Sequence, residues 1–308
     1  MSPTFEPASK TAFKERRLAL LATLALLGVT AAWGSTFFLT KDLVTRVPVP
    51  DYLAVRFLIA TLVMVVIFPK AIPRLDRAAR RHALLLGVLY GIAQLLQTFG
   101  LAHTPATVSG FITGMYVVFT PVFAALILRH RIGWATWGAV LLAVCGLGVL
   151  TLSGFSIGYG ETLTLISAMM YALHIVGLGA WSKPDNALGI AILQLAAITV
   201  VCVVAAAPGG IELPDRGTDW ASLIYMAVIA GALSMLGQTW AQAHLPPTRS
   251  AIIMSMEPVF AALFAVWLGG ENFTQRMLFG GAMVLAAMLI VELVPRRHIE
   301  GEVTHISV

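Results

Sequence analysis

The sequence predicts an all-α integral membrane protein with ten transmembrane helices, arranged as two inverted repeats of five helices each. Three observations support this prediction. The 308 residues are 58% hydrophobic and only 11% charged, whereas a soluble domain holds about 25% charged residues. The apolar residues fall into ten runs of about 20, the length that spans a bilayer core. Matched strings also recur in the two halves of the chain.

The ten runs lack the alternation of barrel strands, and in lipid a helix satisfies its own backbone hydrogen bonds. We therefore expect helices at about 18–39, 52–69, 83–102, 107–128, 134–152, 161–181, 188–207, 220–243, 249–268 and 276–294. The first run has a second interpretation, because KERR (14–17) before an apolar segment is also typical of a signal peptide, with a loose cleavage site at Val29-Thr30-Ala31. Cleavage would remove one helix of ten and spoil the internal repeat, so a transmembrane helix is favoured.

Basic residues predict the orientation of these helices. With a cytoplasmic N-terminus, the external loops hold only Lys41, Arg46, Arg216 and Arg276. Every other lysine and arginine except Arg56, which lies within a span, then falls on the cytoplasmic side. This is the positive-inside pattern, so both termini are expected in the cytoplasm. The basic net charge of +5 thereby reflects orientation, and no nucleic-acid partner is expected.

The internal repeat extends through all five helices of each half. Residues 121–126 and 258–263 both read PVFAAL, and QTFGLAHTPATVS at 97–109 matches QTWAQAHLPPTRS at 238–250. The expected organisation is a tail at 1–13, repeats at 14–152 and 153–295, and a tail at 296–308. Because each repeat holds an odd number of helices, the second crosses the membrane in the opposite sense. Inverted repeats are common in transporters, where the substrate site lies near the midplane between the halves.

Several motifs in this order resemble the drug/metabolite transporter superfamily, specifically its EamA-type members. They are WGSTFFLTK at 33–41, VRF at 55–57 and the paired proline motifs, within a five-plus-five plan that covers about Leu18 to Val294. The resemblance implies ten helices, cytoplasmic termini, a central cavity, and export or exchange of small metabolites such as amino acids. One feature departs from the pattern: GGEN places Glu271 after the ninth span, but LRHRIGW at 128–134 carries no acid at the corresponding place.

Glu257 is the most informative single residue. It lies about 12 Å into the ninth expected helix, near the middle of a core about 30 Å thick. An acidic group there costs roughly 2.5–3.5 kcal/mol if it faces lipid, so we expect it to face inward. It is either a cavity carboxylate for a proton, a cation or a substrate ammonium, or a hydrogen-bonded glutamate that bridges helices. Thr120 occupies the matched position in the first half.

Pro121 and Pro258 each remove a backbone donor and loosen a helix, which would free the carbonyls of Val117 and Met254. Their matched places favour hinges for alternating access, although they could simply bend the helices to fit. Arg56, whose matched residue is the neutral Gln194, either snorkels outward, has a structural partner, or recognises an anionic group in the cavity.

Polar and aromatic side chains mark the helix faces that point away from lipid, where a substrate site must lie. The candidates for binding substrate, in addition to Glu257, are Trp33, Thr36, Gln94, Gln97, Thr113, Tyr116, Tyr171, His174, Ser234, Gln238 and Ser255. Pairs three residues apart, such as Tyr171 and His174, share a helix face. Each pair can equally hold helices together. His174 is also a possible proton carrier, because its ordinary pKa is near neutrality.

The sequence contains no P-loop, HExxH or GxSxG motif, so it predicts neither an ATP-driven pump nor a hydrolase, and no cofactor or metal. The predicted function is a secondary active transporter, an exporter or exchanger of a small metabolite, in the inner membrane of a bacterium. Proton coupling through Glu257 is a separate hypothesis. A membrane enzyme acting on a lipid or prenyl carrier, and a non-transporting membrane scaffold, are the alternatives.

Overall fold

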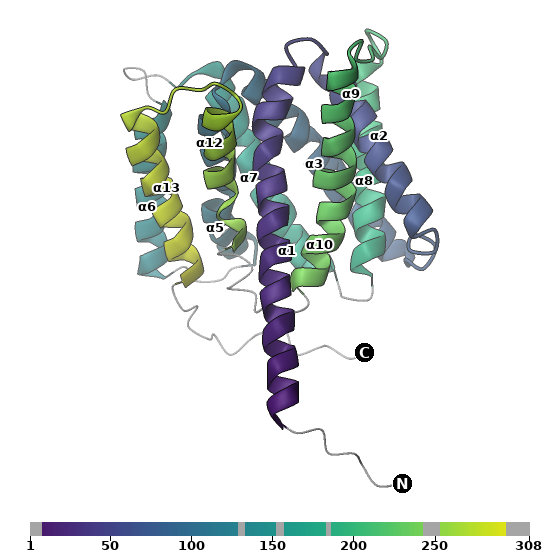
Figure 1. Cartoon of the computed structure of the whole chain (residues 1–308), viewed down its shortest axis with the longest axis horizontal. Coiled ribbons are helices and arrows are strands. Elements are labelled where there is room, and N and C mark those ends of the chain that lie inside the picture. Colours follow the sequence, from purple (N-terminus) through teal and green to yellow (C-terminus); the bar gives the residue numbers. More distant parts are fainter. Residues whose placement is uncertain (1–7, 129–132, 152–156, 183–185, 243–252, 294–308) are drawn as a thin grey trace.

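The computed structural model describes residues 8–128, 133–151, 157–182, 186–242 and 253–293, and these form a bundle of roughly parallel helices (Figure 1). Seven helices are long and apolar enough to cross a membrane, and three shorter apolar helices accompany them within the same residues. This agrees with the ten expected spans and confirms the all-α membrane fold. The tails expected at 1–13 and 296–308 lie largely outside the described residues.

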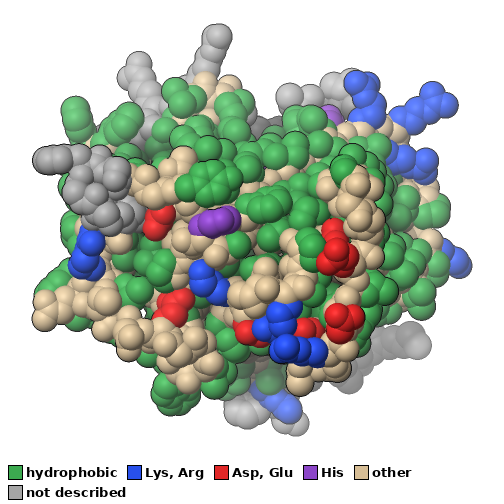
Figure 2. Space-filling model, turned by 90° about the horizontal axis from the view of Figure 1, so that it is seen from above, with side chains coloured by type: hydrophobic (Ala, Val, Ile, Leu, Met, Phe, Trp, Pro, Cys, Tyr) green, Lys and Arg blue, Asp and Glu red, His purple; other side chains and the backbone are tan. Residues whose placement is uncertain are grey.

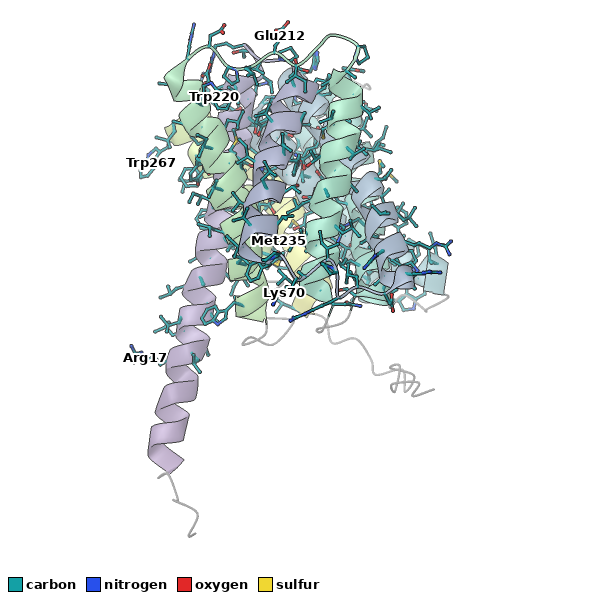
Figure 3. The ribbon with its side chains drawn as sticks, turned by 90° about the vertical axis from the view of Figure 1, so that its right-hand side faces the viewer. Arg17, Lys70, Glu212, Trp220, Met235 and Trp267 are labelled. Carbon is teal, nitrogen blue, oxygen red and sulfur yellow. The ribbon has the colours of Figure 1, made fainter. Side chains whose placement is uncertain are left out.

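The helices of the first half are α1 (Ala8–Leu43), α2 (Val49–Ile67), α3 (Arg77–His103), α4 (Ala106–Gly114), α5 (Tyr116–Leu128) and α6 (Trp134–Thr151). Those of the second half are α7 (Tyr159–Trp181), α8 (Ala187–Ala206), α9 (Gly217–Ile224), the π-helix η1 (Tyr225–Leu233), α10 (Ser234–Gln242), α12 (Glu257–Trp267) and α13 (Gln275–Leu293). We call the end of the bundle beside the N-terminus the proximal end and the opposite one the distal end. Arg17 and Lys70 lie toward the proximal end, whereas Glu212 and Trp220 lie at the distal end (Figure 3).

Equivalent helices of the two halves pack against each other, as expected for inverted repeats. The second helices, α2 and α8, are in contact, as are the fifth helices, α6 and α13. Where α2 meets α8, the hydroxyls of Thr61 and Thr199 lie 3.1 Å apart and share a hydrogen bond. These two threonines are 138 residues apart, the same offset that pairs Arg56 with Gln194. A residue that touches its own counterpart lies close to a pseudo-twofold axis.

The buried apolar side chains form two main cores. One core joins α2, α8 and the π-helix, and includes Tyr52, Ile192 and Met226. The other joins α4, α6, α12 and α13, and includes Ile112 and Val284. In Figure 1, α2 and α8 of the first core lie on one side of α1, and α6, α12 and α13 of the second core lie on the other. The polar residues considered below lie on helices that connect the two sides, mainly α1, α3 and α7.

The fourth and ninth spans are interrupted, which the hydropathy pattern did not predict. The fourth span breaks at Met115, between α4 and α5, six residues before Pro121. The ninth span has a turn at Ser255 and Met256, and α12 begins at Glu257. Pro258 therefore occupies the first turn of a helix, where a missing N–H needs no partner, rather than the interior of a continuous one as expected. Pro121 does lie inside its helix.

The eighth span contains a π-helix over Tyr225–Leu233, between α9 and α10. Its register is visible at Ser234, whose backbone N–H bonds to the carbonyl of Ile229, five residues earlier. The Ser234 hydroxyl donates to the same carbonyl at 2.8 Å. Such π segments widen a helix locally and occur often at functional sites. The ninth and eighth spans thus both depart from regular α-helix near the middle of the bundle.

Candidate functional site

A buried hydrogen-bond network joins three helices of the two halves. The Tyr171 hydroxyl on α7 lies 2.7 Å from Oε1 of Gln94 and 2.9 Å from Oε1 of Gln97, both on α3. The Nε2 amide of Gln97 in turn donates to Thr113 on α4 at 3.0 Å. Gln94 and Tyr171 are less than a tenth exposed. Four of the residues expected from the sequence therefore do come together, at the junction of the halves.

A second cluster adjoins this network through Tyr90 on α3. The Tyr90 ring lies 4.9 Å from the Tyr171 ring and 5.1 Å from the His174 imidazole, measured between centroids. The Nε2 atom of His174 shares a hydrogen bond of 2.5 Å with Oε1 of Gln194 on α8. A neutral imidazole that donates here has its proton held by a buried amide. His174 thus has a structural partner. That partner, Gln194, is the residue that the internal repeat matches with Arg56.

Arg56 points into the protein and does not snorkel. Its Nη1 atom donates to the hydroxyl of Tyr52 at 2.8 Å, and that tyrosine is fully buried. Its guanidinium also lies over the Phe57 ring, 5.4 Å from the centroid. Arg56 has no carboxylate within salt-bridge distance among the described residues. A half-buried cation without an anionic partner can bind one.

Glu257 carries the complementary charge from the second half. It is half-buried at the first turn of α12, where a helix N-terminus favours a negative charge. No side chain in the described part of the chain forms a hydrogen bond or ion pair with its carboxylate. Among the described residues, Arg56 on α2 and Glu257 on α12 are thus two ionisable side chains without an ion-pair partner, one from each half.

The first helix contacts the π-helix through side chains of the WGSTFF motif. The Trp33 indole N–H donates to the carbonyl of Ala230 at 2.8 Å. Two residues further on, the Ser35 hydroxyl lies 2.9 Å from that of Tyr225. A π-helix leaves backbone groups poorly aligned, so these bonds stabilise the irregular segment. Trp33 is therefore engaged with backbone in this structure.

The remaining candidates lie outside the two polar clusters. The hydroxyl of Thr36 donates to the carbonyl of Trp33 at 2.7 Å, within its own helix, as Ser234 does within the eighth span. Gln238 lies 3.7 Å from the Met254 sulfur, Ser255 is buried in the turn before α12, and Tyr116 begins α5 beside the other break. Apart from Thr36, which lies in the continuous helix α1, these residues lie in the irregular fourth, eighth and ninth spans rather than beside the tyrosine pair.

Two charged side chains hold the turn between α3 and α4 at the distal end. The Lys41 ammonium at the end of α1 donates to the carbonyls of Leu101 at 3.0 Å and Thr104 at 2.7 Å. The Glu271 carboxylate, from the segment after α12, accepts from the backbone N–H groups of Ala106 and Thr107. A cation thus caps the C-terminus of α3 and an anion the N-terminus of α4. Glu271, which has no acidic counterpart in the first half, therefore binds the backbone of the first half.

Further polar contacts connect the halves at this distal end, where acidic and basic side chains gather (Figure 2). Arg46, in the loop after α1, forms ion pairs with Asp42 at 2.5 Å and with Asp219 of α9 at 2.8 Å. Hydrogen bonds from the Arg46 guanidinium to these two carboxylates raise its pKa above the ordinary value. Asp51 also accepts from the backbone N–H of Glu212 at 3.0 Å. The two halves are therefore joined at the distal end by polar contacts of Glu271, Arg46 and Asp51. We call these contacts the distal ties.

Sequence reasoning missed Tyr90, Tyr52 and Lys41 as members of these clusters. Tyr90 had a usable signal, because Tyr90, Gln94 and Gln97 are spaced i, i+4 and i+7 and so share one face of a helix. Lys41 had none, since a lysine at the end of a membrane helix is ordinary. Its backbone carbonyl partners come within reach only when the chain turns between α3 and α4.

The comparison with protein families gives one match that covers both halves. The family described as the EamA-like transporter family matches residues 20–152 and again residues 158–293. Together these segments span most of the chain. The two matches fall one in each half, on either side of the connection between α6 and α7.

Several curated proteins are similar over much of their length. The chain is 30% identical to an uncharacterized transporter of Archaeoglobus fulgidus, covering 89% of this chain and 86% of the relative. It is 26% identical to the threonine/homoserine exporter RhtA of Salmonella typhimurium, covering 90% and 93%. A probable terminal-alkyne amino-acid exporter of Streptantibioticus cattleyicolor is 25% identical over 64% and 68%.

A solved crystal structure shares the fold. It superposes with a TM-score of 0.60 and 17% sequence identity, covering 90% of this chain and 98% of that one. At this identity the similarity establishes the fold alone.

Proposed function

Because the chain belongs to the EamA-like transporter family, we propose that it is a secondary active transporter that exports or exchanges a small metabolite by alternating access. The chain is a multi-pass membrane protein of a family of small-metabolite transporters. The driving force, the substrate and the direction are part of the proposal. An amino acid or a related compound is the proposed substrate, as two of the relatives are named amino-acid exporters.

The observation that carries this proposal is the pair of interrupted helices beside a buried polar network. In secondary transporters with inverted repeats, discontinuous helices at the repeat interface form the substrate site near the midplane. Here α12 begins at Glu257, directly after the turn that interrupts the ninth span. Non-helical backbone at that depth is tolerated where it is buried in protein or lines a cavity. The turn at Ser255 and Met256 fits this position.

The unpaired charges favour a zwitterion over a singly charged substrate. Arg56 would bind the carboxylate of an amino acid through its guanidinium fork, and Glu257 would bind the ammonium. A substrate carrying both charges satisfies each of them at once, which lowers the cost of keeping them in the membrane.

Alternating access would use the distal ties as one of two gates. Lys41 and Glu271 hold the α3–α4 turn, and Arg46 holds α9. Release of the ties that cross between the halves, those of Glu271 and Arg46, would let the halves separate at the distal end. The proximal end would close by the equivalent motion of the inverted half. We further propose that both termini are cytoplasmic in a bacterial inner membrane, and that Glu257 carries a coupled proton.

Flux into proteoliposomes tests this function directly. The purified protein should exchange at least one amino acid from a labelled panel above the rate of empty vesicles. Arg56→Gln and Glu257→Gln should each lower that flux at least about tenfold, the effect of losing about 1.4 kcal/mol of binding. Glu161→Gln, an equal charge change on α7, serves as the control. Absence of flux for every zwitterion, with flux of a singly charged metabolite, would refute the zwitterion site.

A further inference from the structure

A groove at the proximal end of the bundle lies between α3 and α7, away from the polar network. It has a volume of about 690 Å³ and is lined by Ala78, Arg81, His82, Leu84, Leu85, Val88 and Trp181. Six of the seven lining residues come from the first three turns of α3, spaced so that they share one side of that helix. Trp181, the last residue of α7, supplies the opposite wall.

The groove has a basic end and an apolar end. Arg81 and His82 lie at its proximal end, and the His82 ring stacks on Trp181, with centroids 4.3 Å apart and planes 11° apart. Leu85 is 58% exposed and Val88 42% exposed, on the surface that the fold turns toward lipid. Arg81 and Val88 are seven residues apart, or about 10 Å along the helix. This is the distance over which a lipid passes from its phosphate to its acyl chains.

The charge of the surroundings favours an anion at the basic end. The segment that leads into α3 contains Lys70, Arg74, Arg77, Arg80 and Arg81 against the single acid Asp76. The Asp76 carboxylate is engaged as the N-cap of α3, where it accepts from the N–H of Ala79 at 2.6 Å. No acidic residue is among the described residues that line the groove, so an ammonium group would find no partner among these side chains.

We propose that this groove is a binding site for an anionic phospholipid, with the phosphate at Arg81 and His82 and an acyl chain along Leu84, Leu85 and Val88. Basic pockets between membrane helices bind the head groups of anionic lipids, and a guanidinium binds phosphate through two parallel hydrogen bonds. The stacking on Trp181 fixes the His82 ring at the level of the head group, where tryptophan is favoured. The site is independent of what the protein transports.

Lipid binding to the purified protein in neutral detergent tests the proposal by native mass spectrometry. Phosphatidylglycerol should bind at least about fivefold more tightly than phosphatidylcholine with the same acyl chains, the effect of one well-placed basic side chain. Arg81→Gln should abolish this preference. Arg77→Gln is the matched control, because it removes the same charge from the same helix outside the groove, and it should keep the preference.

Val88→Trp separates the two parts of the site, since it fills the apolar end and leaves every charge in place. It should weaken phosphatidylglycerol binding by a factor similar to that of Arg81→Gln. Millimolar glycerol 3-phosphate, which lacks acyl chains, should not displace the lipid. Equal binding of both lipids would overturn the proposal, as would equal losses in Arg77→Gln and Arg81→Gln, full binding in Val88→Trp, or displacement by glycerol 3-phosphate.

Discussion

The two copies of PVFAAL have the same sequence but different surroundings. In the second copy, Pro258 is buried, Ala261 is fully buried and Ala262 is 8% exposed. In the first copy, residues 121–125 are only half-buried, and Leu126 is 71% exposed. The second copy packs between α1 and α4, where a Cβ added to Gly34 would lie 2.5 Å from Phe260 and one added to Gly110 2.7 Å from Ala261. Identical residues thus give a tight contact in one half and a loose one in the other.

Position within the bundle explains this difference. After the break in each span, the second copy runs toward the distal end and the first copy toward the proximal end. The distal end is the one where Glu271 and Arg46 bind residues of the opposite half. Two inverted repeats that adopted identical surroundings would describe a symmetric molecule, closed or open at both ends. If the protein works by the proposed alternating access, the difference between the copies fits the state in which the halves are joined at the distal end.

The largest expected difference between the copies is the effect on transport of Glu257→Gln compared with that of Thr120→Val, at the matched position. Loss of the carboxylate should lower transport between about tenfold and a hundredfold, because about 1.4–2.8 kcal/mol of charge interaction is lost. Thr120 donates only to the carbonyl of Tyr116 in its own helix, so its replacement should change transport less than about twofold. Flux in proteoliposomes across a pH series measures both. Retention of pH-dependent flux in Glu257→Gln would exclude this carboxylate as the coupling site.

Ala261→Leu and Ala124→Leu compare the packing of the copies at matched positions. Ala261→Leu should lower the free energy of unfolding by about 1–3 kcal/mol, the cost of overpacking a filled contact. Ala124→Leu should leave thermal stability nearly unchanged, because its surroundings are looser. It should still reduce transport if, as proposed, the first copy becomes the tightly packed one when the proximal end closes. Thermal unfolding in detergent and flux separate the two effects. Equal destabilisation by both variants would show that the copies are packed alike.

Glu271→Gln tests the acid that only the second half carries. The substituted amide keeps one acceptor but loses the charge that binds the N–H groups of Ala106 and Thr107, which should cost about 1 kcal/mol. Glu161→Gln, which also changes a carboxylate near Lys41, should cost less than half of this. Thermal unfolding measures both. The distal gate should also open more often, so the thiol introduced by Thr107→Cys should react faster with an external reagent when Glu271→Gln is present.

The prolines give the smallest expected contrast. Pro121→Ala supplies an N–H that can donate to the carbonyl of Val117, which should stabilise the protein by about 0.5 kcal/mol. Pro258→Ala should have no measurable effect on stability, because the first turn of a helix leaves its N–H groups without intrahelical partners. Stabilisation by Pro258→Ala instead would mean that α12 extends backward through the turn at Ser255 and Met256 when the proline is removed.

The sequence by itself determined the spans, the repeat and the family resemblance, because these follow from apolar length and from identities that survive any packing. It also identified Tyr171, Gln94 and Gln97, since helical spacing places polar residues of a membrane helix on its inward face. The tertiary structure decided the rest. Breaks at Met115 and Ser255, the π-helix, and the partners of Lys41 and Glu271 depend on contacts between segments far apart in the chain. The two PVFAAL segments illustrate what sequence alone leaves open. A short segment sets its own helix propensity and side-chain shape, whereas its burial depends on the helices that surround it.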